Sequence, residues 1–268
     1  MLTTFYLACY SVLISAHPLR RWVARPYWAT STASAFMPLH QKIKVFLRAV
    51  LRRLTVHRKR VTYVYVDGFN LYYGALKNSA PGHKWLNLLT MSRLMMPGHD
   101  IERIKYFTAH VSARPSDPDQ PVRQQAYLRA LQSLPNIEVI LGRFITKQIR
   151  AALVHPIGKM RTTMVWRTDE KGSDVNLAVH LLHDAYHRKY DAAVVISNDS
   201  DLAEAIRIVR NDFHIPVWVL NPGHPYTSTD LRKVSSSQKR VRSGVIRASQ
   251  FPPSMTDAGG TFQKPASW

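Results

Sequence analysis

The chain has almost no cysteine, since Cys9 is the only one among its 268 residues. A single thiol excludes an internal disulfide framework, and nothing in the composition indicates an oxidising compartment. We therefore expect a cytoplasmic location. A chain of this length can form one large domain or two small ones with a buried core.

Acidic residues are missing from residues 1–60, which contain 11 Lys or Arg and no Asp or Glu. Residues 231–268 contain seven basic residues and one acidic residue, so the two ends carry most of the formal net charge of +20, and residues 61–230 are nearly neutral. A surplus of this size resembles that of a nucleic-acid-binding protein, but its concentration at the two ends changes that interpretation, because the middle is a nearly neutral domain. If the basic ends bind a nucleic-acid backbone, their removal should weaken the affinity for it and the salt dependence of that affinity.

Long apolar runs are also missing, because the hydrophobic first fifteen residues are too short to span a bilayer of roughly 30 Å. We expect no transmembrane span. Residues 1–60 therefore fit a basic extension, either a targeting segment or a start assigned too far upstream with Met37 as the working start. Within it, residues 41–54 predict a basic amphipathic helix that lies on a membrane or RNA surface or packs on the domain.

From Val61 the chain alternates short apolar runs with helical patterns, which indicates βαβ units. We predict an α/β domain over 61–230 with a mainly parallel, Rossmann-like sheet flanked by helices, and a hairpin insertion around 143–170 at the sheet edge. The tail 231–268 is basic and lacks periodicity, so we expect it to be disordered. The expected strands are 61–66, 103–109, 137–142, 192–197 and 215–220, and the expected helices are 86–96, 120–134, 174–188 and 200–211.

Four aspartates fall where the predicted strands end or the next helices begin. They are Asp67, Asp174, Asp199 and Asp201. Ligands of an open parallel sheet lie beyond the carboxyl ends of its strands, so these acids should converge at one edge. Gathered carboxylates repel one another unless a hard cation such as Mg²⁺ or Mn²⁺ neutralises them, and such a site can activate water against a phosphodiester. Taken singly, each aspartate could instead be a helix cap.

Other polar residues near this edge have two interpretations each. Asn70 could hydrogen-bond a ligand or cap a helix, and Arg114 could hold a phosphate or stabilise a turn. Lys171 could meet a phosphate or simply lie in a loop. His180, His183 and His187 share one helix face, which we expect to point to solvent rather than to a metal.

Three segments, "YVDGFNLYYG", "EKGSDVNLAVHLL" and "VVISNDSDLAEAI", resemble the signature segments of NYN domains in the PIN-like nuclease superfamily. The resemblance covers about 61–222 and implies metal-dependent cleavage of RNA. Carried onto this chain, it implies an acidic Mg²⁺ or Mn²⁺ site made of Asp67, Asp174, Asp199 and Asp201, with Asn70 and Ser197 assisting. Asn198 stands where other members often have glycine, and Leu202 replaces an aromatic residue.

The same segments also resemble a subgroup described as NADH-dependent hydroxylases of 6-hydroxy-3-succinoylpyridine, which act in nicotine breakdown. That resemblance implies NADH as cofactor and a small pyridine as substrate. No G-x-G-x-x-G motif follows any predicted strand, so the sequence contains no recognisable NADH-binding motif. A nuclease-like binding protein that does not cleave is a third alternative, and the sequence leaves a homo-oligomer open.

Overall fold

The computed structural model describes residues 59–77, 82–223 and 226–268. The basic extension and the amphipathic helix expected over 41–54 lie outside these ranges. Within them, no helix combines the length and the apolar composition that crossing a bilayer requires.

Six parallel strands form the central sheet, in the order β3-β2-β1-β6-β7-β8. The predicted mainly parallel α/β fold is thereby confirmed. Of these six strands, the one that the sequence does not predict is β8, a polar strand that pairs with β7 at the edge of the sheet. The strands are β1 (Arg60–Asp67), β2 (His99–Thr108), β3 (Ile137–Leu141), β6 (Ala192–Ile196), β7 (Val217–Asn221) and β8 (Ser237–Arg240).

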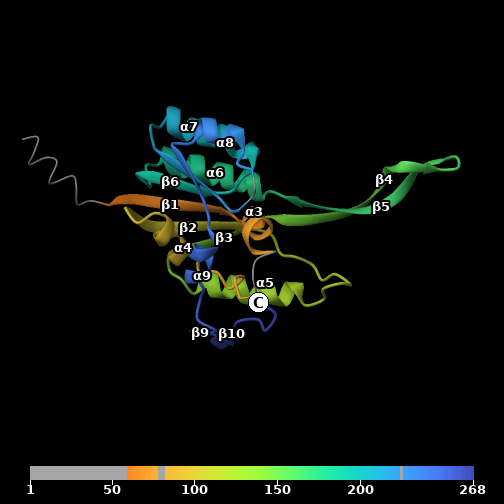
Figure 1. Cartoon of the computed structure of the whole chain (residues 1–268), viewed down its shortest axis with the longest axis horizontal. Helices are drawn as coiled ribbons and strands as arrows, with labels where there is room; N and C mark the ends of the chain where they lie inside the picture. The colour runs from red at the N-terminus through yellow and green to blue at the C-terminus, as the bar shows by residue number, and fades with distance from the viewer. Residues whose placement is uncertain (1–58, 78–81, 224–225) are drawn as a thin grey trace, which may run out of the picture. The chain divides into compact units, whose positions relative to one another are not determined.

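Helices cover both faces of this sheet (Figure 1). One face carries α6 (Ser173–Tyr186), α7 (Ala203–Asn211) and α8 (Thr229–Val234), and the other carries α4 (Leu88–Met95), α5 (Gln120–Gln132) and α9 (Ser243–Ala248). Short helices α3 (Gly68–Leu71), η4 (Tyr72–Leu76) and η5 (Ser200–Leu202) follow strands β1 and β6.

The domain has two hydrophobic cores, one on each face of the sheet. Strand β1 contributes to both, because its side chains alternate between the two faces. Val64 and Val66 pack with α4, α5 and α9, whereas Tyr65 packs with α6 and α7. All three side chains are buried. A strand that is apolar on both sides is typical of a parallel sheet with helices on each face.

An antiparallel ribbon, β4 (Arg143–Ile157) with β5 (Met160–Lys171), leaves the domain between β3 and α6. It forms a two-stranded sheet of its own, and Figure 1 shows it extending away from the helices. The predicted hairpin insertion around 143–170 is therefore confirmed, although it does not hydrogen-bond to the edge of the central sheet.

The tail 231–268 is ordered, so the prediction of disorder is wrong. After β8 it forms α9 and the hairpin β9 (Ser254–Asp257) with β10 (Gly260–Gln263). Phe251 is buried, and Trp85 packs edge-on against Phe251, Phe262 and Trp268. The few apolar side chains of the tail are irregularly spaced and pack on residues distant in sequence, so periodicity cannot reveal them.

Candidate active site

The order of the strands creates a crevice at the carboxyl ends of β1 and β6. From β1 the chain proceeds outward to β2 and β3, then returns through α6 to β6 on the other side of β1. Loops that follow such neighbouring strands turn away in opposite directions, which leaves room for a ligand between them. Asp67 ends β1, and Ser197 and Asp199 follow β6.

Asp67 is buried at this crevice and both of its carboxylate oxygens are held. Oδ1 accepts a hydrogen bond of 2.9 Å from the backbone N–H of Asn70, so Asp67 is the N-cap of α3. Oδ2 accepts a 3.0 Å bond from the hydroxyl of Ser197. Gly68 follows directly, and a Cβ there would lie 2.7 Å from the carbonyl oxygen of Phe107. The turn after Asp67 is thus packed against β2 without space for a side chain.

Asn70 and Ser197 connect the two loops. The side-chain oxygen of Asn70 accepts a 3.0 Å bond from the backbone N–H of Asn198. The Ser197 hydroxyl oxygen also accepts a 3.1 Å bond from the backbone N–H of Asp199. Asn70 and Ser197 therefore fix the β1 and β6 loops to each other, and Asn70 is not the cap of its helix.

Asp199 and Asp201 differ in their positions. Asp199 is the N-cap of η5, where it accepts a 3.0 Å bond from the backbone N–H of Asp201, and its side chain lines the cavity described below. Asp201 is exposed in the first turn and is not among the residues that line the cavity.

Asp174 reaches the same crevice from the first turn of α6. The helix starts at Ser173 because Glu170, at the end of β5, accepts bonds from the Ser173 backbone N–H (3.2 Å) and hydroxyl (2.8 Å). Gly172 has φ +100°, a conformation that favours glycine. Sequence reasoning missed Glu170. Its position just before the predicted start of a helix, where an acidic side chain is stabilised by the helix N-terminus, is the signal that could have identified it.

Electrostatics shows that these acids share one site, which we call the carboxylate cluster: Asp67, Glu170, Asp174, Asp199 and Asp201. Burial, and then the charges of the other four acids, raise the pKa of Asp174 to about 6. Burial also raises the pKa of Asp67, aided by Asp199 and opposed by the bonds from Asn70 and Ser197. Of the four predicted acids, Asp67, Asp174 and Asp199 line one cavity, whereas Asp201 affects Asp174 only through its charge.

A hard divalent cation fits the chemistry of this donor set. All of the donors are carboxylate oxygens, and the groups that perturb Asp174 most are negative rather than cationic. As placed, the side chains of residues 59–77, 82–223 and 226–268 include no group of three or more His, Cys, Asp or Glu positioned to hold one ion. Joint ligation by the cluster would therefore require its side chains to draw together.

A cavity of about 760 Å³ opens beside the cluster. Asp67, Glu170, Asp174 and Asp199 form its acidic side. Aromatic and basic residues, which are suited to bases and phosphates, share the remaining wall with neutral polar and aliphatic residues and with one further acid, Asp117. Its aromatic members are Phe69, Tyr72, Tyr73, Tyr106, Tyr127, Phe144 and Trp268, and its basic members are Lys84, Arg114 and Arg123.

The two basic residues singled out from the sequence lie in different places. Arg114 lines the cavity, and its backbone pairs with Asp117 in the turn before α5. Arg123, on α5, holds the same turn through a 2.6 Å bond to Asp117. Lys171 borders a separate depression with Gly142 and Asn176, and its ammonium lies 3.8 Å from Asp169. Arg114 is thus positioned to meet a ligand of the cavity, whereas Lys171 belongs to the neighbouring depression.

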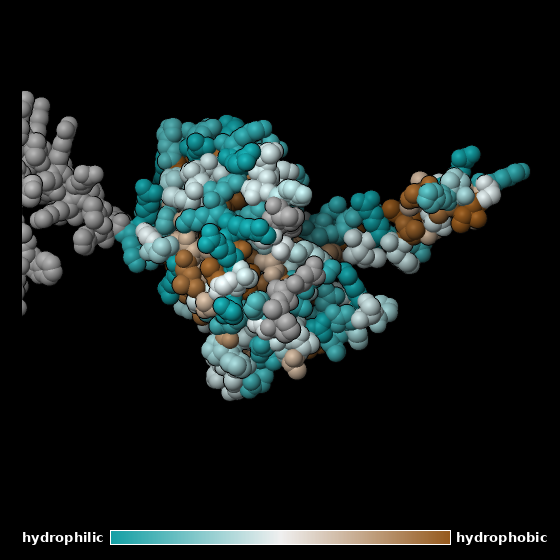
Figure 2. All heavy atoms as spheres, viewed as in Figure 1, coloured by the Kyte–Doolittle hydropathy of each residue, from teal (hydrophilic) through white to brown (hydrophobic). Residues whose placement is uncertain are grey.

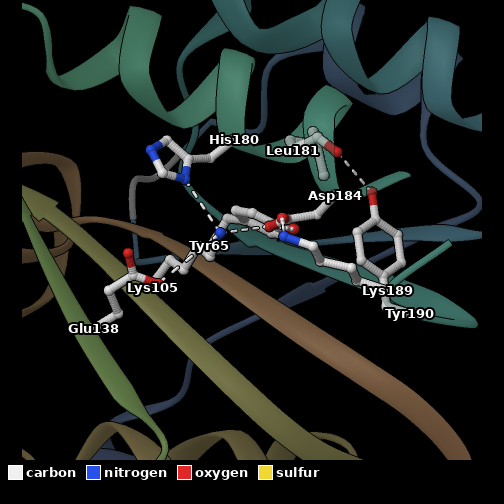
Figure 3. Close-up of polar contacts among 8 residues, drawn as sticks. All are labelled: Tyr65, Lys105, Glu138, His180, Leu181, Asp184, Lys189 and Tyr190. Atoms are coloured by element: carbon white, nitrogen blue, oxygen red, sulfur yellow. Dashed lines mark hydrogen bonds and ion pairs between the residues drawn. The ribbon is translucent and has the colours of Figure 1, made fainter. Parts of the chain in front are cut away.

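A buried ion pair attaches α6 to the sheet (Figure 3). The Lys105 ammonium on β2 lies 2.6 Å from Oδ2 of Asp184, which also accepts a 2.8 Å bond from the hydroxyl of Tyr65 on β1. Lys189 donates a 3.1 Å bond to the other oxygen. Burial opposes ionisation, but the bonds from the two lysines and Tyr65 prevail and lower the pKa of Asp184. Asp184 is ten residues after Asp174 on the same helix, so the pair helps to hold the helix that carries Asp174.

One of the three α6 histidines takes part in this network. His180 Nδ1 lies 3.1 Å from the Lys105 ammonium, and the ring packs edge-on against Phe107. The expectation of a wholly solvent-facing histidine face is therefore wrong for His180. Burial and the charge of Lys105 lower its pKa. His183 and His187 are exposed, with their ring centroids 4.5 Å apart.

Comparison with known protein families gives a match that includes all five residues of the carboxylate cluster. The family model described as NYN domain matches residues 61–238. The 6-hydroxy-3-succinoylpyridine 3-monooxygenase HspA of Pseudomonas putida (strain DSM 28022 / S16) is 33% identical over 236 residues, covering 77% of this chain and 75% of that protein. A solved structure of a protein of unknown function, VPA0982 from Vibrio parahaemolyticus RIMD 2210633, has a TM-score of 0.47 and 16% identity, covering 70% of this chain and 96% of that one.

Proposed function

Because the chain belongs to the NYN domain family, we propose that it is a nuclease that hydrolyses RNA phosphodiesters at the carboxylate cluster with Mg²⁺ or Mn²⁺. The observation that supports the proposal most is the pKa of Asp174, which burial and four neighbouring carboxylates raise to about 6. Clustered acids whose pKa values are perturbed by one another, in a cleft, are typical of functional sites.

Asp67, Asp174 and Asp199 would hold the cation, since all three line the cavity beside one another's charges. When bound, a divalent cation neutralises the carboxylates and lowers the pKa of a coordinated water. Asp67 is pre-oriented for this role, because Ser197 and the backbone of Asn70 fix its two oxygens.

The other residues of the cavity have their own roles in the proposal. Lys84 and Arg114 can bind phosphate oxygens. Tyr73 lines the cavity with 47% of its surface exposed, so its ring can stack on a base.

The test is cleavage of a labelled single-stranded RNA by the full chain with Mg²⁺ or Mn²⁺, before and after replacement of single acids. Asp67→Asn and Asp174→Asn should each lower the rate by roughly 10²- to 10⁴-fold, the usual contribution of a positioned acid or base. Asp212→Asn is the matched control, because Asp212 is exposed at the end of α7. Cleavage that persists in both cluster variants at the rate of the control would refute the proposal.

The second candidate activity comes from the name of the relative, a 6-hydroxy-3-succinoylpyridine 3-monooxygenase. The cavity gives this candidate a concrete basis, since aromatic rings and Arg114 could hold a pyridine ring and its acid side chain. Oxidation of NADH that depends on 6-hydroxy-3-succinoylpyridine, in the same protein preparation, would support it. Such oxidation without RNA cleavage would replace the nuclease proposal.

A further inference from the structure

The ribbon β4–β5 exposes large apolar side chains that a free hairpin does not need. Trp166 is 70% exposed and Met164 54% exposed, midway along the ribbon, and Val154 near the tip is 89% exposed. Figure 2 shows hydrophobic residues gathered on the outer part of the ribbon, with hydrophilic residues between them and the domain. Exposed apolar side chains that are gathered in this way usually mark an interaction surface.

The register of the two strands shows which side chains share a face. Phe144 pairs with Glu170 and Thr146 with Thr168, and the two threonine hydroxyls are 2.9 Å apart. Phe144, Thr168 and Glu170 line the cavity, so this is the face of the ribbon that continues the cavity wall.

Further out, the same face carries Trp166 opposite Gln148 and Arg150 opposite Met164, because side chains alternate with a period of two. At roughly 3.3 Å per residue, Trp166 lies about 13 Å along the ribbon from Glu170 of the carboxylate cluster, and Arg150 lies about 20 Å from Phe144.

Charge indicates what kind of partner the ribbon fits. Between residues 146 and 168 the ribbon contains five Lys or Arg and no Asp or Glu; Arg150 lies on the face of Trp166, whereas Lys147 and Arg167 pair on the opposite face. Arg150 is exposed and lies two positions beyond Gln148, the cross-strand partner of Trp166. An exposed indole with basic side chains along an extended path is the arrangement by which proteins hold single-stranded nucleic acid without reading its sequence.

We propose that the ribbon holds a single-stranded RNA segment that leads into the cavity, with a base stacked on Trp166 and a phosphate bound by Arg150. This inference rests on the proposed function for what happens at the cavity, but binding by the ribbon does not depend on cleavage. It predicts that the substrate is an RNA strand long enough to reach from the carboxylate cluster to Trp166, rather than a dinucleotide.

A second copy of this chain is the other occupant to consider, with ribbon packed on ribbon. Two copies of residues 146–168, which contain basic residues and no acids, would repel each other, and this repulsion disfavours pairing of ribbon with ribbon. The apolar side chains of the tip could tolerate it, so the oligomeric state of each variant is measured as well.

The test measures affinity without cleavage. Fluorescence anisotropy in EDTA gives the dissociation constants of a long and a very short labelled single-stranded RNA for the full chain. Trp166→Ala should weaken the affinity for the long RNA by roughly 5- to 150-fold, the effect of removing one base-stacking ring. The affinity for the short RNA should be unchanged. Arg150→Ala should reduce the slope of log K against log salt by about 0.7, the loss of one phosphate contact.

Two controls match these variants. Tyr186, also 70% exposed, lies at the far end of α6, and Arg93 is an exposed arginine on α4. Tyr186→Ala and Arg93→Ala should leave both RNA affinities unchanged.

The outcomes separate the ribbon from the proposed nuclease. Long-RNA affinity equal in Trp166→Ala and wild type would overturn the ribbon proposal, even if RNA is cleaved. Ribbon-dependent binding by a protein that cleaves no RNA would support the ribbon proposal and overturn the nuclease. A wild-type chain that binds no RNA in EDTA would overturn the ribbon proposal and leave the nuclease to the cleavage test. A change of oligomeric state in Trp166→Ala, with RNA affinity intact, would assign the ribbon to self-association instead.

Discussion

Replacing Asp174 by asparagine should stabilise the folded protein at about pH 8 when no divalent cation is present. The pKa of Asp174 is raised from 3.8 to about 6, first by burial and then by the charges of Asp67, Asp199 and the other acids. The folded chain therefore holds this proton more tightly than the unfolded chain does. Stability consequently falls as pH rises from about 4 to about 6, and the loss is complete above the folded pKa.

The size of the effect follows from the pKa shift. A shift of about two units corresponds to ~3 kcal/mol at 1.36 kcal/mol per unit. Asp174 is partly exposed, so solvent screening reduces this to ~1 kcal/mol. For a domain of this size ~1 kcal/mol raises the melting temperature by roughly 2–4 °C.

The assay is thermal unfolding of wild type and Asp174→Asn in EDTA at about pH 8 and about pH 4, followed by a repeat at the higher pH with Mg²⁺ or Mn²⁺. We expect a gain at pH 8 that disappears at pH 4, where the wild-type carboxyl is protonated in the folded state. A cation that neutralises the cluster should also abolish the gain. If Asp174→Asn raised the melting temperature equally at both pH values, or lost stability at pH 8, the inference that these acids repel one another would be refuted. Asp201→Asn, at the exposed member of the cluster, should have a much smaller effect.

Three further predictions concern stability. Lys105→Met removes the main partner of the buried Asp184 carboxylate and should lower the free energy of unfolding, measured in urea, by about 3–5 kcal/mol. Lys189→Met is the control, because its side chain is 43% exposed, and should cost less than about 1 kcal/mol. Gly68→Ala should cost about 1–3 kcal/mol in the same assay, because its Cβ would lie 2.7 Å from a carbonyl oxygen of β2, and Gly98→Ala, with no atom within 4 Å, should be tolerated. Phe251→Ala should lower stability by about 3–5 kcal/mol, since the ring is buried against the core; no change would mean that the tail is not packed there.

Much of the fold could be predicted because its signals are local. The apolar run that ends at Asp67 is a buried parallel strand, and the helices after it show their periodicity within single segments. Strand β8 could not be predicted in this way. Its sequence, "SQKR", is polar, and only pairing with β7, from Trp218 to Asn221, makes it a strand. Edge strands of this kind have partners but no hydrophobic pattern.

The candidate site was predictable where a rule of topology applied. Acids that follow neighbouring parallel strands lie at the same edge of the sheet, and Asp67 and Asp199 line one cavity there. Glu170 escaped notice because it belongs to the ribbon, whose sequence indicates a hairpin but not that its last residues cap α6. His180 was misplaced because helical geometry gives its face but not the neighbour, Lys105, that comes from β2. Contacts between distant segments are what a single sequence shows least.

The strand order also divides the sheet into two halves of three strands, which hydrogen-bond to each other along the seam between β1 and β6. The ribbon is the covalent link at the midpoint, with its turn at Gly158. Asp67 belongs to the half before the ribbon, and Asp174 and Asp199 belong to the half after it. A chain cut at that turn would therefore give two fragments, neither of which holds all three aspartates. Refolding of the mixed fragments would then report on the contacts that join the two halves: the pairing of β1 with β6, the Lys105–Asp184 ion pair and the packing of the tail on Trp85.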